Sequence, residues 1–177
     1  MKLAQFKTKQ SAAPRLGLSS NDGLIDVADL ARAVADAGGS VADWLLSAAT
    51  TLEVIARGSE ALDQITLLLG EAQSRAIAPV TLSFDSIEFL PAVNAGKILA
   101  IGRNYVDHAI EGGAAPPEAP LIFNKLPNSL SAHNAPIVLP TISKQVDYEA
   151  ELAVVIGRRA KRVSEDEAGL CFWLHVD

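Results

Sequence analysis

The sequence predicts an α+β protein, with a small N-terminal α/β domain over residues 1–92 and a second, strand-rich domain over residues 93–177. Two observations carry this prediction. Short strand-like runs and helical apolar stripes alternate over the first part of the chain. From Ala78 onward the helical period gives way to short apolar runs, and Pro91 marks the change. The domain boundary is therefore expected near residue 92.

The N-terminal domain is expected to begin with three strands. Residues 2–7 alternate in polarity, residues 15–18 form a second run, and residues 24–27 form the returning strand. Between the last two lies Asn21-Asp22-Gly23, whose residue types tolerate the left-handed backbone of a hairpin turn. Two further short strands are expected at residues 80–82 and 87–89.

Three helical segments are expected between these strands. Asp29 can cap a helix that runs through Ala37, where Gly38-Gly39 ends it. Ser40 can cap a second segment, and a third is expected over residues 59–76. Their apolar residues recur at helical steps and are expected to pack into the core: Val41, Trp44, Leu45 and Ala48 in the second segment, and Leu62, Ile65, Leu69 and Ala72 in the third.

Bulk composition excludes several functional classes. The 177 residues are 49% hydrophobic and 20% charged, which is typical of a globular protein. A net charge of −6 without a long basic run argues against nucleic acid or an anionic membrane as a partner. The lone Cys171 excludes a disulfide framework or a thiolate zinc site. Neither a signal peptide nor a membrane span is recognisable, so a soluble, cytoplasmic protein is expected.

The first chemically suggestive segment is an apolar strand, residues 97–102, followed by residues 103–113. If the latter are helical, His108 and Glu111 share one face because they lie three residues apart. An imidazole held by a carboxylate can act as a general base towards water. The same spacing also fits an ordinary surface pair.

The second segment, residues 119–125, places Lys125 at the end of an apolar strand. A lysine there could stabilise the charge of an enolate or a carboxylate. Strand-end lysines are also commonly just solvated.

The third segment combines acidic residues with an apolar strand expected to be buried, residues 152–156. Side chains alternate along a strand, so Asp147, Glu149 and Glu151 would project from one face. Such closely spaced carboxylates repel each other unless a cation lies between them, and hard oxygen ligands suit Mg²⁺, Mn²⁺ or Ca²⁺. The alternative is an exposed acidic strand face.

Together these segments, IGRNYVDHAIE from residue 101, FNK from residue 123 and DYEAELAVVIG from residue 147, resemble the fumarylacetoacetate hydrolase family in order and spacing. The first ninety residues also resemble that family's small N-terminal domain, so the resemblance extends to about Ala168. It implies that the second domain is the first part of a mixed β-barrel or β-roll catalytic domain.

The resemblance also implies an enzyme and its residue roles. Glu149 and Glu151 would bind the metal, His108 and Glu111 would form a water-activating dyad on a lid segment, and Lys125 would face the substrate. The implied reaction is metal-dependent hydrolysis of a carbon–carbon bond in a small 2,4-diketo acid, and a homodimer is implied. Decarboxylases, isomerases and lyases of 2-keto acids occur in the same family and stay open as alternatives.

The end of the chain departs from the family, whose members continue to a Gly-Tyr-Thr strand and an Asn-Asp pair that supplies a third ligand. Residues 164–168 match the family's helix start with a capping box, but residues 170–177 match nothing. A one-base shift in suitable codons for Leu-Cys-Phe-Trp-Leu-His would read Phe-Val-Phe-Gly-Tyr-Thr. We therefore expect a frameshift near residue 169.

A truncated chain has two expected consequences. The strand at residues 152–156 would expose an apolar edge, and catalysis would be impaired, which leaves a non-catalytic fragment as a further alternative. Asp177 is not expected to replace the third ligand, because a chain end is a poor scaffold for a metal.

Overall fold

The structure, a computed structural model, describes residues 1–113, 115 and 117–173, without the side chains of His108 and of residues 169–173. It divides into two compact units, residues 1–93 with 132–177 and residues 94–131. Antiparallel strands and helices are both present, which agrees with the predicted α+β class. The predicted domains, 1–92 and 93–177, and the predicted barrel or roll stay predictions.

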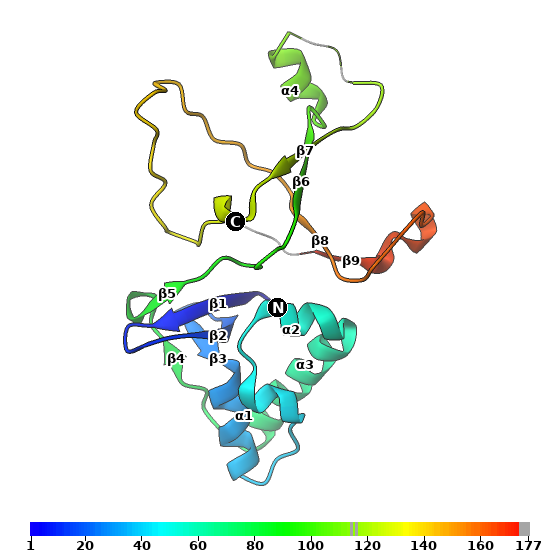
Figure 1. Ribbon diagram of the computed structural model, residues 1–177. Coiled ribbons are helices and arrows are strands. Elements are labelled where there is room, and N and C mark those ends of the chain that lie inside the picture. The colour runs from blue at the N-terminus through cyan, green and yellow to red at the C-terminus, as the bar shows by residue number, and fades with distance from the viewer. Residues whose placement is uncertain (114, 116, 174–177) are drawn as a thin grey trace. The chain divides into compact units, whose positions relative to one another are not determined.

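The N-terminal sheet has five antiparallel strands in the order β4-β3-β2-β1-β5 (Figure 1). Each expected strand is present, although β2 begins four residues earlier than the pattern indicated. The chain returns after its helices to add both edge strands. The bounds are β1 Leu3–Thr8, β2 Ser11–Ser19, β3 Leu24–Asp26, β4 Thr81–Leu82 and β5 Ile87–Phe89.

Gly23 closes the turn between β2 and β3, as its residue type predicted. Its φ of 157° is rarely adopted by other residues, and a Cβ there would lie 2.0 Å from the carbonyl oxygen of Leu82. Glycine is therefore required by the close approach of β4 as well as by the turn. The backbone N–H of Ser20 donates to the carbonyl of Gly23 at 2.9 Å and completes the turn.

Helix α1, Val27–Asp36, begins earlier than expected because Asp26, not Asp29, is its N-cap. The carboxylate of Asp26 accepts a hydrogen bond from the backbone N–H of Asp29 at 2.9 Å. Asp26 is also the last residue of β3, so the strand passes into the helix without a loop. The carboxylate of Asp29 instead accepts from Arg15 and Arg32.

The segment that Ser40 was expected to cap is not an α-helix. It is a 3-10 helix, Asp43–Ser47, and no side chain caps it at Ala42. The sequence analysis also missed α2, Thr51–Arg57, whose signal was present as a capping box: Thr50 and Glu53 satisfy each other's backbone N–H groups.

Helix α3, Ser59–Ser74, begins where the pattern indicated and ends two residues before the predicted residue 76. Its buried face is shifted slightly, because Leu62 and Leu69 are only partly buried. Figure 1 shows α1, α2 and α3 on one side of the sheet. The buried core between these helices and the sheet comprises Leu16, Leu18, Val27, Leu30, Ala31, Val34, Leu45, Ala48, Val54, Ala61, Ile65, Leu68 and Ala72.

The second unit is a two-stranded antiparallel sheet of β6, Ile98–Gly102, and β7, Leu121–Lys125. Helix α4, Val106–Glu111, lies in the connection between them. The two expected strands and the expected helix are thus present, with the helix shorter than the predicted residues 103–113. All five residues of β7 are exposed.

The last described elements correct the expectation for residues 152–156. Only β8, Val154–Ile156, is a strand, and it pairs with β9, Cys171–Trp173. Val154 and Ile156 are 42% and 62% exposed. The burial inferred from composition is therefore wrong, whereas the apolar exposure expected for a truncated chain is observed. Burial of a sheet face requires a second layer of structure, and the described residues do not cover these two side chains with one.

A 3-10 helix, Glu165–Leu170, precedes β9. Half of the predicted capping box is present, because the backbone N–H of Ser164 donates to the carboxylate of Glu167 at 3.1 Å. The hydroxyl of Ser164 donates to the same carboxylate at 2.9 Å, and the backbone N–H of Glu167 donates to the carbonyl of Ser164 at 3.1 Å. Within the described part of the chain, no helix is long and apolar enough to span a membrane.

Candidate functional site

The segment between β6 and β7 places the predicted dyad on a helix. Arg103 adopts a left-handed backbone with φ 55°, which lets the chain leave β6 and enter α4 within a few residues. His108 and Glu111 both belong to α4, and their three-residue spacing puts them on neighbouring positions of one face. Glu111 is exposed. The side chain of His108 lies outside the described residues, so the dyad stays a prediction.

Ala109 marks the buried side of α4. It is only 1% exposed, and its backbone N–H donates to the carbonyl of Tyr105 at 3.1 Å. Ala109 and Glu111 lie about 160° apart around the helix at about 100° per residue. The carboxylate of Glu111 is therefore on the side of α4 that faces away from its buried residue.

Lys125 ends β7, as the sequence predicted, and is exposed. Its Nζ lies 5.6 Å from the centre of the Phe123 ring, within the range of a cation–π interaction. Lys125 pairs with Ile98, whereas Leu121 pairs with Gly102 at the end of β6 that leads to α4. These two ends lie about 13 Å apart along the strand. By this register, Lys125 and α4 lie at opposite ends of this sheet.

The acidic residues before β8 do not form the predicted strand face. Asp147, Glu149 and Glu151 are exposed and lie outside any strand, because β8 begins only at Val154. The carboxylate of Asp147 accepts a hydrogen bond from the N–H of Tyr148 at 2.8 Å. The shared face inferred from strand alternation is therefore wrong for this structure.

The donor chemistry at Glu149 and Glu151 nevertheless suits a hard divalent cation, since both offer carboxylate oxygens. The described residues contain no group of three or more metal-binding side chains. A third ligand is therefore not assembled among them, and metal binding stays a prediction. Asp177, which we did not expect to bind metal, lies outside the described residues.

Two shifted pKa values in the N-terminal domain belong to structural contacts. The hydrogen bond to Asp26 raises the pKa of Arg15, although burial opposes that effect. Burial would raise the pKa of Glu53, but hydrogen bonds from the N–H groups of Ala49 and Thr50 outweigh it and lower this pKa. The shift of Arg15 reflects its ion pair with the N-cap residue of α1, and the shift of Glu53 reflects the capping box of α2.

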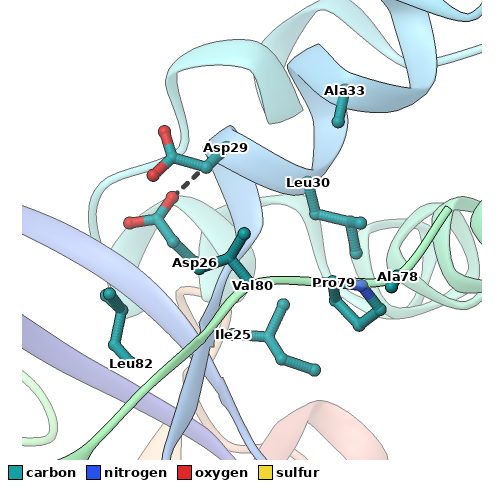
Figure 2. A pocket seen from close by; sticks show the side chains of 9 residues that line it. All are labelled: Ile25, Asp26, Asp29, Leu30, Ala33, Ala78, Pro79, Val80 and Leu82. Atoms are coloured by element: carbon teal, nitrogen blue, oxygen red, sulfur yellow. Dashed lines mark hydrogen bonds between the residues drawn. The ribbon is translucent and has the colours of Figure 1, made fainter.

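A small cavity of about 70 Å³ lies between the start of α1 and the segment leading to β4 (Figure 2). Two carboxylates, those of Asp26 and Asp29, are among the side chains around it, and both bind Arg15. No residue that the sequence singled out for catalysis lines it. The lining residues are Ile25, Asp26, Asp29, Leu30, Ala33, Ala78, Pro79, Val80 and Leu82.

Comparison with known proteins supplies independent information. Residues 97–174 match the family described as fumarylacetoacetate (FAA) hydrolase C-terminal. The match passes Ala168, where the resemblance was expected to end, so part of the segment thought to match nothing falls inside it. The frameshift near residue 169 stays a prediction.

Individual relatives extend the match to the N-terminal domain. Oxaloacetate tautomerase fahd2, mitochondrial, of Xenopus laevis is 34% identical over 168 residues, which cover 95% of this chain and 48% of that protein. Oxaloacetate tautomerase FAHD2A, mitochondrial, of Bos taurus is 33% identical over the same shares.

A third relative matches a shorter stretch of the chain. The 2,4-didehydro-3-deoxy-L-rhamnonate hydrolase of a Sphingomonas species is 49% identical over 79 residues, 45% of this chain and 28% of that protein. The chain spans about half the length of the tautomerases that it matches. The family match and the relatives together establish that the chain belongs to the fumarylacetoacetate hydrolase family.

Proposed function

We propose that this chain contributes to an enzyme that acts on a small 2-keto or 2,4-diketo acid through an enolate. The observation that carries the proposal is the match over 95% of the chain to an oxaloacetate tautomerase, together with the 49% identity over 79 residues to a 2,4-didehydro-3-deoxy-L-rhamnonate hydrolase. Both reactions require negative charge to develop on an oxygen next to the reacting carbon. An enolate is therefore the species that they share.

The proposed site uses the residues that the sequence singled out. Glu149 and Glu151 would hold a divalent cation, Mg²⁺ in the first instance or Mn²⁺ or Ca²⁺, with the hard oxygen donors that such ions prefer. When bound, the cation would supply Lewis acidity towards a carbonyl oxygen. Lys125 would pair with the substrate carboxylate or the enolate oxygen. Within its own unit, Lys125 lies at the end of the β6–β7 sheet away from α4.

Carbon–carbon hydrolysis is the first candidate reaction. His108, oriented by Glu111, would accept a proton from water, and the hydroxyl oxygen would add to one carbonyl of the diketo acid. The bond between this carbonyl and the neighbouring carbon then breaks, and its electron pair forms the enolate. Protonation of that carbon completes the reaction and yields two acids. The helical spacing of His108 and Glu111 in α4 supports these roles.

Keto–enol tautomerisation is the second candidate, favoured because the relatives that cover nearly the whole chain are named for it. His108 would remove a proton from the carbon next to the keto group, and a proton would be delivered to the oxygen. No water is consumed and the mass of the substrate stays unchanged. Decarboxylation of the same acids would instead release carbon dioxide, and a lyase would release a second product without adding water.

A non-catalytic fragment is the third candidate. It is favoured by the described residues, which gather no group of three metal-binding side chains. Such a chain would neither turn over keto acids nor respond to a divalent cation.

Product analysis by proton NMR separates these candidates. The full chain is supplied with Mg²⁺ and given oxaloacetate or an acylpyruvate. Two acids from the acylpyruvate indicate hydrolysis, and accelerated enol–keto interconversion of oxaloacetate indicates tautomerisation. Lys125→Met is expected to lower the rate at least about tenfold, the loss typical of a removed electrostatic stabiliser, whereas Lys144→Met, also an exposed lysine, serves as the matched control. No turnover of either acid would reject the enzymatic proposal for this chain.

A further inference from the structure

Two polar side chains lie almost fully buried in the N-terminal domain. Gln5, on β1, is 1% exposed, and Thr51, the first residue of α2, is 2% exposed. Burial of an amide or a hydroxyl is unfavourable unless each finds hydrogen-bond partners. Their partners therefore show what the two residues do.

The partners of Gln5 and Thr51 lie in the segment by which the chain leaves the domain. Gln5 Nε2 donates to the carbonyl of Pro91 at 2.6 Å, and Thr51 Oγ1 donates to the carbonyl of Ala92 at 2.6 Å. The backbone N–H of Thr51 donates to Gln5 Oε1 at 3.3 Å, which fixes the orientation of the amide. The backbone N–H of Leu90 also donates to the carbonyl of Gln5 at 2.9 Å.

These contacts continue the attachment of the chain beyond its last strand. Strand β5 ends at Phe89, and Pro91 has no N–H with which a sheet could continue. The carbonyls of Pro91 and Ala92 are held by side chains instead of by a neighbouring strand. In the described part of the chain, no buried side-chain nitrogen or oxygen lacks a partner, so this arrangement is complete.

We propose that Gln5 and Thr51 form an exit latch that keeps residues 90–92 on the N-terminal domain and places the hinge of the chain at Val93. The linker to β6 then runs from Ala92 to Ile98 instead of from Phe89. Fully extended, these lengths reach about 22 Å and about 32 Å. A shorter tether confines β6 and α4 to a smaller volume around the point where the chain leaves the N-terminal domain. Their effective concentration near that point is therefore higher. The proposal does not depend on the proposed function.

Amide hydrogen exchange of the full chain tests the exit latch. Thr51→Val removes the hydroxyl bond to Ala92 while keeping the backbone N–H that binds Gln5, and Gln5→Met removes the amide bond to Pro91. Each is expected to speed exchange at Leu90 at least about tenfold relative to Ile65 in the core, because local opening then costs one hydrogen bond less. Thr51→Ser keeps a hydroxyl and is expected to restore the slow exchange.

A matched control separates the latch from general stability. Gln64→Met removes the hydrogen bonds of Gln64 with Trp44 and Glu60, which lie within the domain and away from the exit. It is expected to leave the exchange ratio of Leu90 to Ile65 within about twofold of the wild type, because distant sites act independently. The latch is rejected if Thr51→Val changes that ratio no more than Gln64→Met does, or if Thr51→Val unfolds the domain as a whole.

Discussion

The N-terminal domain and the β6–β7 unit use similar apolar strands but bury them very differently. Phe6 and Leu16 on the first sheet are fully buried, while Ile122 and Phe123 on β7 are 64% and 48% exposed. The first sheet has five strands and helices on one face, whereas β6 and β7 form a pair. An isolated strand pair is marginal in water because it has no second layer to cover its apolar face.

The comparison teaches that the local pattern and the burial of a strand are separate properties. Residues 98–102 and 121–125 form strands because of their composition, but composition supplies no partner layer. Two of the predicted catalytic residues, Glu111 and Lys125, are exposed in this sparsely covered unit.

The largest expected effect separates the two regions by stability. Ile65→Ala, at a fully buried position of α3, is expected to cost about 2–5 kcal/mol of unfolding free energy because it leaves a cavity. Ile122→Ala on β7 is expected to stay within about 0.5 kcal/mol. Urea unfolding followed by Trp44 fluorescence measures both. Equal losses of unfolding free energy in the two variants would show that Ile122 is buried in solution. The contrast between the two sheets would then be wrong.

The strand-to-helix junction provides the next effect. Asp26→Ala removes the N-cap of α1 and the ion pair with Arg15, with an expected loss of about 1–3 kcal/mol. The matched control is Asp36→Ala, which removes an exposed carboxylate at the far end of the same helix. This control is expected to change stability by less than about 0.5 kcal/mol. Thermal unfolding compares the stability of the two variants. Similar losses of stability would show that Asp26 does not stabilise α1 by capping it.

The capping box of α2 predicts a dependence on pH. The pKa of Glu53 is lower in the folded state, so its contribution is present above the unfolded value of 4.5 and is lost as the pH falls through the folded value. Glu53→Gln should therefore be less stable than the wild type at neutral pH, and the two should converge in acid. Urea midpoints measured from neutral pH down to well below the unfolded value test this. A constant difference across that range would contradict it.

The smallest expected effect concerns the surface of the same domain. The guanidinium of Arg57 lies 4.6 Å from the centre of the Trp44 ring. Arg57→Ala is expected to cost about 0.5–1 kcal/mol at this exposed position and to shift the fluorescence of Trp44. Arg32→Ala, at a guanidinium that binds Asp29, should leave the emission unchanged. Identical spectra for the wild type and Arg57→Ala would exclude the contact.

Prediction from sequence succeeded where local pattern determines structure. The five N-terminal strands, α3 and the turn at Gly23 follow from alternation, helical periodicity and residue type. The cap of α1 was placed three residues late because Asp26 serves both the strand and the helix. A residue that ends a strand and also caps a helix is set by the geometry of the junction between β3 and α1. Neither the strand pattern nor the helix pattern alone predicts it.

Contacts between residues far apart in the chain could not be predicted from local sequence patterns. Nothing near Gln5 indicates that its amide binds Pro91, because 86 positions separate them in the chain. At the candidate site, the sequence placed Lys125 at a strand end and Glu111 on a helix, and both are found there. The prediction that Glu149 and Glu151 share one strand face was wrong, because side chains alternate in this way only within a strand, and no strand forms at these residues.

Divalent-metal binding tests the central claim most directly. We expect saturating Mg²⁺ or Mn²⁺, at about 100 times the dissociation constant, to stabilise the full chain by about 2.7 kcal/mol, with a corresponding rise in Tm. The double variant Glu149→Gln with Glu151→Gln should lose that rise, whereas Glu165→Gln with Asp166→Asn, also two exposed carboxylates, should retain it. A rise that survives in the first variant, or no rise in the wild type, would contradict a metal site at Glu149 and Glu151.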